Sequence, residues 1–242
     1  MKAFEFFSAK RQQFAQRAQA AFAQYKEAKK QRGMTLLEVI IVLGIIGTIA
    51  AGVVVLAQRA FDSRTVSELV SNTNTVRVAV KDVYQREGVY PSVKTSETLA
   101  LTNTTITNSA QSSIITAALV QMGKTSIDEV RNPISNDFIA IGGAITSNGS
   151  KVAKGYVMEL NGLDQSQCRN IIGQVGNNWD FVAVGVAGAG AYSITENYDL
   201  TQAVNGNVLK SLAAGGSATI DATKILSVCT DSATNSVILG SR

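Results

Sequence analysis

The sequence contains no histidine, and this absence excludes several kinds of site. A Ser-His-Asp triad, a Cys-His dyad and a His-ligated metal site each need an imidazole, which none of the 242 residues provides. Carboxylate chemistry remains possible, but Asp128, Glu129, Asp137, Glu159 and Asp180 show no spacing that pairs them as an acid and a base. We therefore expect a protein that is not an enzyme, with no catalytic residue, metal ligand or cofactor.

Proline and cysteine are scarce. The two prolines are Pro91 and Pro133, so no proline interrupts a helix in the first 90 residues. The two cysteines, Cys168 and Cys229, lie in the C-terminal part. An even number in an exported domain indicates a disulfide, and closing a loop of about 60 residues would stabilise the fold by about 4 kcal/mol. Two buried free thiols are the alternative.

Charge is nearly absent between Leu36 and Ala57, where Glu38 is the one ionisable residue. An apolar run of about 20 residues spans the hydrocarbon core of a bilayer as a helix. The segment 1–33 before it has a net charge of +6. Because the whole chain has a net charge of +4, residues 34–242 have a net charge of −2. Lys and Arg beside an apolar span keep that side in the cytoplasm. We therefore expect the C-terminal part to face outward, and we expect no nucleic-acid partner.

Glu38 needs an explanation, because a charged group inside a membrane helix costs about 2.5–3.5 kcal/mol on insertion scales. Its position near the start of the apolar run allows the side chain to reach the lipid headgroups. Alternatively, it pairs with a cation inside an assembly of several copies.

The heptapeptide Gly33-Met34-Thr35-Leu36-Leu37-Glu38-Val39 resembles the class III signal of type IV pilins. That signal has Gly before the cleavage point and a carboxylate as the fifth residue of the mature chain. The long leader, Met34 as the new first residue and the two cysteines are similar to the type IVb subgroup, in which the toxin-coregulated, longus and colonisation-factor pilins of enteric pathogens look closest. The close match covers residues 32–91.

The resemblance implies processing and assembly. A prepilin peptidase would cut between Gly33 and Met34 and methylate the Met34 amine, and Glu38 would set the register of subunits in a helical homo-oligomer. A cytoplasmic ATPase, an inner-membrane platform and an outer-membrane secretin would be the further partners. The precursor would cross the inner membrane once, with its N-terminus in the cytoplasm, and the mature form would belong to an extracellular pilus for adhesion, aggregation and colonisation.

The resemblance also implies an α+β pilin fold, in which a long N-terminal helix packs on an antiparallel sheet as an αβ-roll. We divide the chain into a cleaved leader (1–33), a transmembrane or filament-core half-helix (34–57), an amphipathic half-helix (58–91) and a globular head (92–242). The head contains the region bounded by the cysteines (168–229).

Three alternatives remain at this point. A type II secretion pseudopilin or a minor pilin would share the cleavage signal. A single-pass membrane-anchored protein would keep its leader and form no filament. A secretory peptidase could instead cut after Val55-Leu56-Ala57 and release a soluble protein, which would leave Glu38 without a role.

The long helix is expected over residues 35–86. Its second half carries an apolar stripe at spacings of three and four, made of Val66, Leu69, Val70, Thr73, Val76, Val80 and Val83. Gly44, Gly47 and Gly52 weaken the helix but permit close approach of other helices. We favour close packing over local melting of the helix.

The head is expected to mix short helices and strands. Residues 95–113 predict a solvated loop, and residues 126–131 a turn. A short helix is predicted at 112–122 from its apolar residues. Helices are also predicted at 165–175 and 222–228, because Asp164 and Asp221 before them are good N-caps. Antiparallel strands are predicted at 138–145, 154–160, 181–186 and 236–239.

Overall fold

The computed structural model of the chain describes residues 35–216 and 219–242. The chain divides into two compact units, 1–58 and 59–242, and we call the second unit the head. The expected leader and the Gly33–Met34 bond lie outside the described residues. The helix α2 (Leu36–Tyr84) begins in the first unit and ends in the second.

Local sequence explains both ends of α2. At the start, the Glu38 amide donates to Thr35 Oγ1 at 3.3 Å, so Thr35 satisfies one of the free N–H groups of the first turn. At the end, Gly88 takes a φ of 67°, and its amide donates to the Tyr84 carbonyl at 3.2 Å. The observed helix is close to the predicted 35–86.

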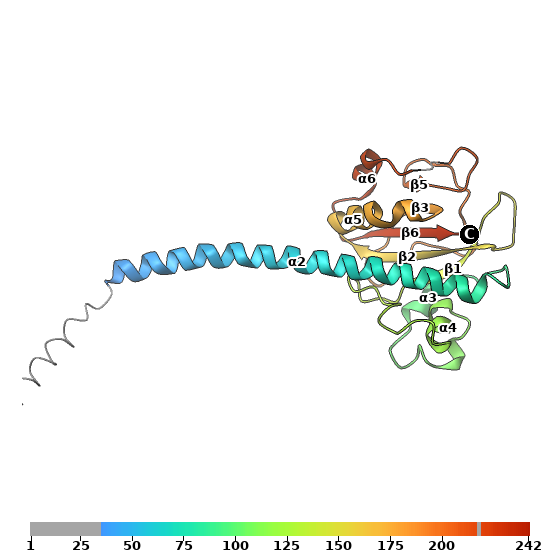
Figure 1. Ribbon diagram of the computed structural model, residues 1–242, viewed down its shortest axis with the longest axis horizontal. Helices are drawn as coiled ribbons and strands as arrows, with labels where there is room; N and C mark the ends of the chain where they lie inside the picture. Colours follow the sequence, from blue (N-terminus) through green and yellow to red (C-terminus); the bar gives the residue numbers. More distant parts are fainter. Residues whose placement is uncertain (1–34, 217–218) are drawn as a thin grey trace, which may run out of the picture. The chain divides into compact units, whose positions relative to one another are not determined.

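The head contains a six-stranded sheet in the order β4-β1-β2-β6-β3-β5 (Figure 1). The strands are β1 (Ala140–Ile145), β2 (Gly155–Leu163), β3 (Phe181–Val186), β4 (Tyr198–Asp199), β5 (Val208–Lys210) and β6 (Asn235–Ser241). The four predicted strands correspond to β1, β2, β3 and β6, which pair antiparallel as expected. The short strands β4 and β5 were not predicted, and β4 pairs with β1 in parallel.

One face of the sheet packs against helices. Tyr156, Met158 and Leu160 of β2 alternate onto this face and join the main core, to which the second half of α2 contributes Val66, Leu69, Val76 and Val80. All four α2 side chains are buried, so the predicted stripe is the surface that this helix presents to the head.

The opposite face is covered by irregular chain. Strand residues whose side chains point to this second face, such as Val157, Phe181 and Ile238, form a second cluster with Ile194 and Leu200. We call residues 187–197, which run from β3 toward β4, the strap. Both faces of the sheet are therefore buried, which explains why eight of the nine residues of β2 are buried and its apolar residues do not alternate with exposed polar ones.

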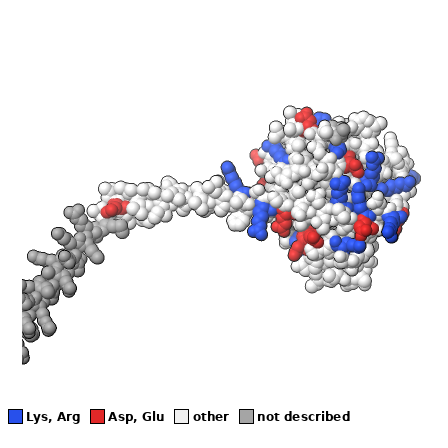
Figure 2. Space-filling model, viewed as in Figure 1, with Lys and Arg blue, Asp and Glu red and all other residues white. Residues whose placement is uncertain are grey.

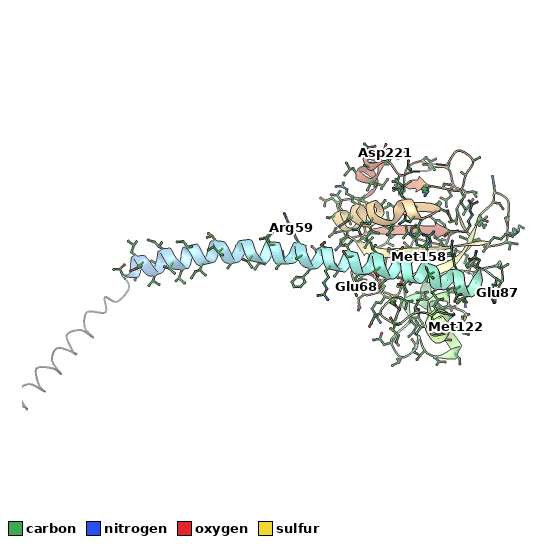
Figure 3. The ribbon with its side chains drawn as sticks, viewed as in Figure 1. Arg59, Glu68, Glu87, Met122, Met158 and Asp221 are labelled. Carbon is green, nitrogen blue, oxygen red and sulfur yellow. A yellow bond between two sulfur atoms is a disulfide. The ribbon has the colours of Figure 1, made fainter. Side chains whose placement is uncertain are left out.

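Short helices complete the head: α3 (Thr95–Leu99), η1 (Ser109–Gln111), α4 (Ile115–Gln121), α5 (Gln165–Val175), η2 (Gly176–Asn178) and α6 (Ala222–Val228). The helices α5 and α6 have the predicted bounds. Asp164 forms a capping box with Gln167, and Asp221, labelled in Figure 3, accepts from the Thr223 amide. The prediction of a plain loop over 95–113 was wrong in part, because α3 and η1 lie there.

Candidate functional site: an exposed apolar helix and a disulfide-bounded head

The first part of α2 exposes apolar side chains over its whole circumference. Leu36, Leu43 and Leu56 are 78%, 62% and 66% exposed. An 18-residue window of α2 has a mean hydropathy of 2.9 with none of it buried, so the helix is long and apolar enough to cross a membrane. Figure 2 shows a single acidic spot near its start, where Glu38 is the one charged residue of the run. An apolar surface of this kind needs lipid or protein to cover it.

Glu38 lies at the third position of the helix. Thr35-Leu36-Leu37-Glu38 fits the capping-box pattern, and the Glu38 amide makes the bond to Thr35 Oγ1 described above. A carboxylate in the first turn also interacts favourably with the helix dipole. Among the described residues, however, Glu38 forms no ion pair, because the two that occur are Lys94–Glu97 and Lys124–Asp82. The carboxylate is exposed and available to a cation from elsewhere.

Gly44, Gly47 and Gly52 have open surroundings. A Cβ placed on any of them would meet no atom within 4 Å. Within the part of the chain that the structure describes, therefore, no neighbouring atom requires glycine at these positions. Close helix packing at the three glycines stays a prediction that involves other copies.

Cys168 and Cys229 form a disulfide with a Cα–Cα distance of 6.0 Å. Cys168 lies in α5 and Cys229 follows α6, as predicted, and both are buried. Two hydrogen bonds run beside the disulfide: Arg169 Nη2 donates to the Leu226 carbonyl at 2.8 Å, and Gln165 Nε2 donates to the Cys229 carbonyl at 3.1 Å. The disulfide thus ties α6 to α5, which packs on the sheet.

The strap is held to the sheet by Glu159, a fully buried carboxylate of β2. The Ser193 amide donates to both carboxylate oxygens at 2.9 and 2.8 Å, the Ser193 hydroxyl donates at 2.6 Å and the Ile194 amide at 2.9 Å. These neutral donors offset the cost of burying the carboxylate. Sequence reasoning set Glu159 aside, although its position between Met158 and Leu160 of a buried strand was a signal that its side chain had partners.

Asp137 makes a second attachment of the strap. Its Oδ2 accepts from the Gly190 amide at 2.7 Å and from Asn161 Nδ2 at 2.7 Å. The same Asn161 amide group donates to the carbonyls of Gly188 and Ala191. Asp137 and Glu159 therefore act in packing the head. Within the described residues, no group of three or more His, Cys, Asp or Glu side chains could hold a metal ion.

Two known protein families match this chain, one in the head and one around the start of α2. Residues 118–238 match the family described as toxin-coregulated pilus subunit TcpA, and residues 28–54 match the prokaryotic N-terminal methylation motif. The toxin coregulated pilin of Vibrio cholerae serotype O1 (strain ATCC 39315 / El Tor Inaba N16961) is 34% identical over 216 residues, covering 87% of this chain and 89% of that protein. This chain belongs to the toxin-coregulated pilin family.

Two further comparisons support the assignment of this pilin to the family. Another toxin coregulated pilin from Vibrio cholerae is 34% identical over 201 residues, covering 82% of this pilin and 83% of that one. The crystal structure of TcpA, a type IV pilin from the Vibrio cholerae El Tor biotype, aligns with a TM-score of 0.57 at 23% identity. It covers 74% of this pilin and 99% of that chain, which shows that the α+β pilin fold is shared.

The pilin is therefore a structural subunit of a type IV pilus, of the type IVb group. The family and its methylation motif imply polymerisation into a filament and processing by a prepilin peptidase. They do not favour the pseudopilin alternative. The motif match spans the predicted cleavage point at Gly33–Met34, as well as Glu38 and most of the apolar run.

Proposed function

We propose that the pilin is made as an inner-membrane precursor with a cytoplasmic N-terminus, cut between Gly33 and Met34 and methylated at the Met34 amine. Residues 34–57 cross the membrane once before assembly and pack in the filament core afterwards. Residues 58–91 contain the amphipathic second half of α2, which ends at Tyr84, and residues 92–242 form the globular part that packs against it. The basic leader supports this orientation, because its net charge of +6 favours the cytoplasmic side.

The observation that carries the proposal is the apolar half of α2. Its side chains are exposed on every side, and its 18-residue window is entirely unburied within the chain. A bilayer can cover such a helix before assembly, and the same helices from other subunits can cover it in a filament. Gly44, Gly47 and Gly52 would allow those helices to approach closely.

Cleavage changes the charge at the start of this helix. It removes the +6 leader and creates a new amine at Met34, four residues before Glu38. In a filament, Glu38 of one subunit lies near the Met34 amine of a neighbour. Each charge alone is costly in an apolar core, whereas a wrong axial register leaves both unpaired. Glu38 is thus a register residue more than a source of net stability.

The remaining steps need other proteins. A cytoplasmic ATPase supplies the energy for extrusion, an inner-membrane platform receives the subunits and an outer-membrane secretin releases the filament. The pilin itself has a structural role without catalysis, and the filament serves adhesion, aggregation and colonisation. The heads form the filament surface, with the region between Cys168 and Cys229 exposed.

Intact mass and N-terminal sequencing of the chain from cells with and without a prepilin peptidase test the processing. We expect a chain that begins at Met34 and carries one extra methyl group, only when the peptidase is present. A chain that begins at Gln58 would indicate a secretory cut, and an unprocessed chain in both strains would indicate a plain membrane anchor. Either result would overturn the proposal.

Glu38→Gln tests the register role separately from the helix start. Gln fits the third position of a capping box as well as Glu does, so α2 should still begin at the same place. Filament yield should fall about tenfold or more, which corresponds to about 1.4 kcal/mol or more. The amount of subunit in the membrane should not change.

Thr35→Ala is the matched control for this substitution. It removes the oxygen that accepts from the Glu38 amide but keeps the carboxylate. Filament yield from Thr35→Ala should stay within about twofold of the parent, because an N-cap contributes only about 1 kcal/mol to a helix of this length. Normal yield from Glu38→Gln, or an equal loss from both variants, would refute the register role.

A further inference from the structure

One end of the head carries an excess of cations. Lys81 lies in the last turn of α2 and Arg86 in the turn that follows it, Lys151 and Lys154 precede β2, and Arg242 follows β6; we call these five residues the basic end. Figure 2 shows Lys and Arg gathered over this end of the head, and Figure 3 places Glu87 there, just after α2. Four of the five side chains are exposed, and Lys81 is half-buried.

Buried contacts bring the three segments of the basic end together. Ser241, next to Arg242, pairs with Tyr156, two residues after Lys154. The Tyr90 amide donates to the Ala153 carbonyl at 3.0 Å. The ring of Tyr90 lies 5.3 Å from that of Tyr156 and 5.9 Å from that of Tyr84, two residues before Arg86. The cations therefore lie on three segments that pack against one another at one end of the head.

None of the five cations of the basic end forms an ion pair within the described part of the chain, although Arg86 interacts electrostatically with Asp82. Neither of the two ion pairs there involves any of the five. Asp82 is next to Lys81 but pairs with Lys124 at 2.6 Å. Glu87, Asp180 and Asp199 also lie near these segments; Asp180 accepts from Ser241 Oγ at 3.0 Å and from the Arg242 amide at 3.1 Å, and Asp199 accepts from the Thr201 amide at 2.8 Å. Lys151 and Lys154 are exposed and pair with no carboxylate of the described residues, so we expect a positive potential around these two lysines.

The chemistry of the basic end suits a polymer with spaced negative groups. Lysine presents a point charge on a flexible stem, which fits anionic groups without fixed geometry. Single-stranded nucleic acids usually also need aromatic platforms on which bases stack. Here the three tyrosines are only 7%, 4% and 0% exposed, for Tyr84, Tyr90 and Tyr156, so they offer none.

We propose that the basic end binds an acidic polysaccharide through its carboxylate or sulfate groups. This inference rests on the proposed function, in which the heads form the surface of the filament. It also names a class of binding partner, which membership of the family does not by itself identify. Many copies along one filament would make the binding multivalent, so that weak single contacts add up to a strong attachment.

The test uses purified filaments of the mature chain and measures their binding to immobilised heparin, alginate and neutral dextran. We expect binding to at least one of the two acidic polymers and none to dextran. Lys151→Ser/Lys154→Ser should weaken that binding at least tenfold. The fall of log affinity with log salt should also become less steep, its slope shrinking in magnitude by about two, or one for each lost contact.

Lys210→Ser/Lys224→Ser is the control with the same change in net charge, because these lysines lie outside the basic end. It should leave the affinity within about twofold of the parent. Arg86→Ser is the second test variant and decides the question if the double variant yields no filaments. Equal losses in test and control variants, or binding no stronger than to dextran, would overturn the inference.

Duplex DNA of matched length is included as a competitor. If it binds the basic end more tightly than either polysaccharide at the same salt concentration, the partner is a nucleic acid and the inference is wrong. Electron microscopy of the parent preparation separates the two proposals. A lack of filaments contradicts the proposed function, whereas filaments that bind no acidic polymer contradict only the assignment of the basic end.

Discussion

Glu159 is the residue on which the second face of the sheet depends. It is fully buried, and within the described residues its hydrogen-bond partners are neutral donors from Ser193 and Ile194. A carboxylate can accept several hydrogen bonds at once, and few other side chains could satisfy two adjacent backbone amides and a hydroxyl. This geometry explains why a charged residue lies between Met158 and Leu160.

Glu159→Gln should lower the free energy of unfolding by about 1–3 kcal/mol. The amide has one acceptor oxygen and an NH2 group that must face the N–H donors of the strap, so at least one buried donor loses its partner. Urea unfolding followed by circular dichroism measures the effect. Glu196→Gln, on an exposed residue at the end of the strap, is the control and should change stability by less than about 0.5 kcal/mol. Equal stability of the two variants would contradict the role of Glu159.

Residues whose partners are close in sequence were predictable, and Glu159 was not. Asp164 caps α5 through the amide of Gln167, three residues later, which is a fixed local pattern. Gly123 follows the C-cap Met122 of α4 with a φ of 67°, the left-handed conformation that glycine commonly takes just after a helix. Ser193 lies 34 residues beyond Glu159 in a segment without regular structure, so no spacing rule connects them.

At the scale of elements, the two missed strands are the edges of the sheet. β4 has two residues and β5 three, which is too short for an alternating pattern to be recognised. Their partners β1 and β3 were predicted from longer apolar runs. Very short edge strands leave few unpaired backbone groups and so reduce edge-to-edge association of heads. Similarly, α3 has five mostly polar residues, and its sequence does not differ from that of the loop around it.

Cys168→Ser/Cys229→Ser should lower the free energy of unfolding by about 4 kcal/mol, because the unfolded chain regains the freedom of a loop of about 60 residues. This effect is measured by urea unfolding of three samples, which are the oxidised parent chain, the reduced parent chain and the double variant. The reduced parent should match the variant. Hydrogen exchange should rise first in α6, which the disulfide ties to α5. A loss below about 1 kcal/mol would show that the disulfide stabilises the fold little.

At the scale of the whole molecule, one continuous helix serves two environments. Up to residue 58, α2 belongs to a unit without the globular core, and beyond it the helix supplies one side of the core of the head. The change from an all-apolar surface to a single apolar stripe was visible in the sequence. Because the head has its own core, assembly through the first half of α2 need not disturb the fold of the head.

Buried tyrosines should limit the stability of the head at alkaline pH. Burial raises the pKa of Tyr198 from 10.0 to about 12, and it raises those of Tyr156 and Tyr192 further. A raised pKa in the folded state means that the unfolded chain loses its proton first. The stabilisation is therefore complete below pH 10 and is lost as the pH rises through 10 toward 12 and beyond.

Urea unfolding at pH 7 to 12 measures this dependence, with return to pH 7 as a check that the disulfide has not exchanged. We expect constant stability up to about pH 9 and a steep decline above pH 10, because each tyrosine that titrates first in the unfolded state adds about 1.4 kcal/mol per pH unit to the slope. Tyr198→Phe removes one such group, so its decline between pH 10 and 12 should be shallower than that of the parent. An identical slope in the two proteins would mean that Tyr198 ionises as readily in the folded head as in the unfolded chain, and that another group sets the alkaline limit.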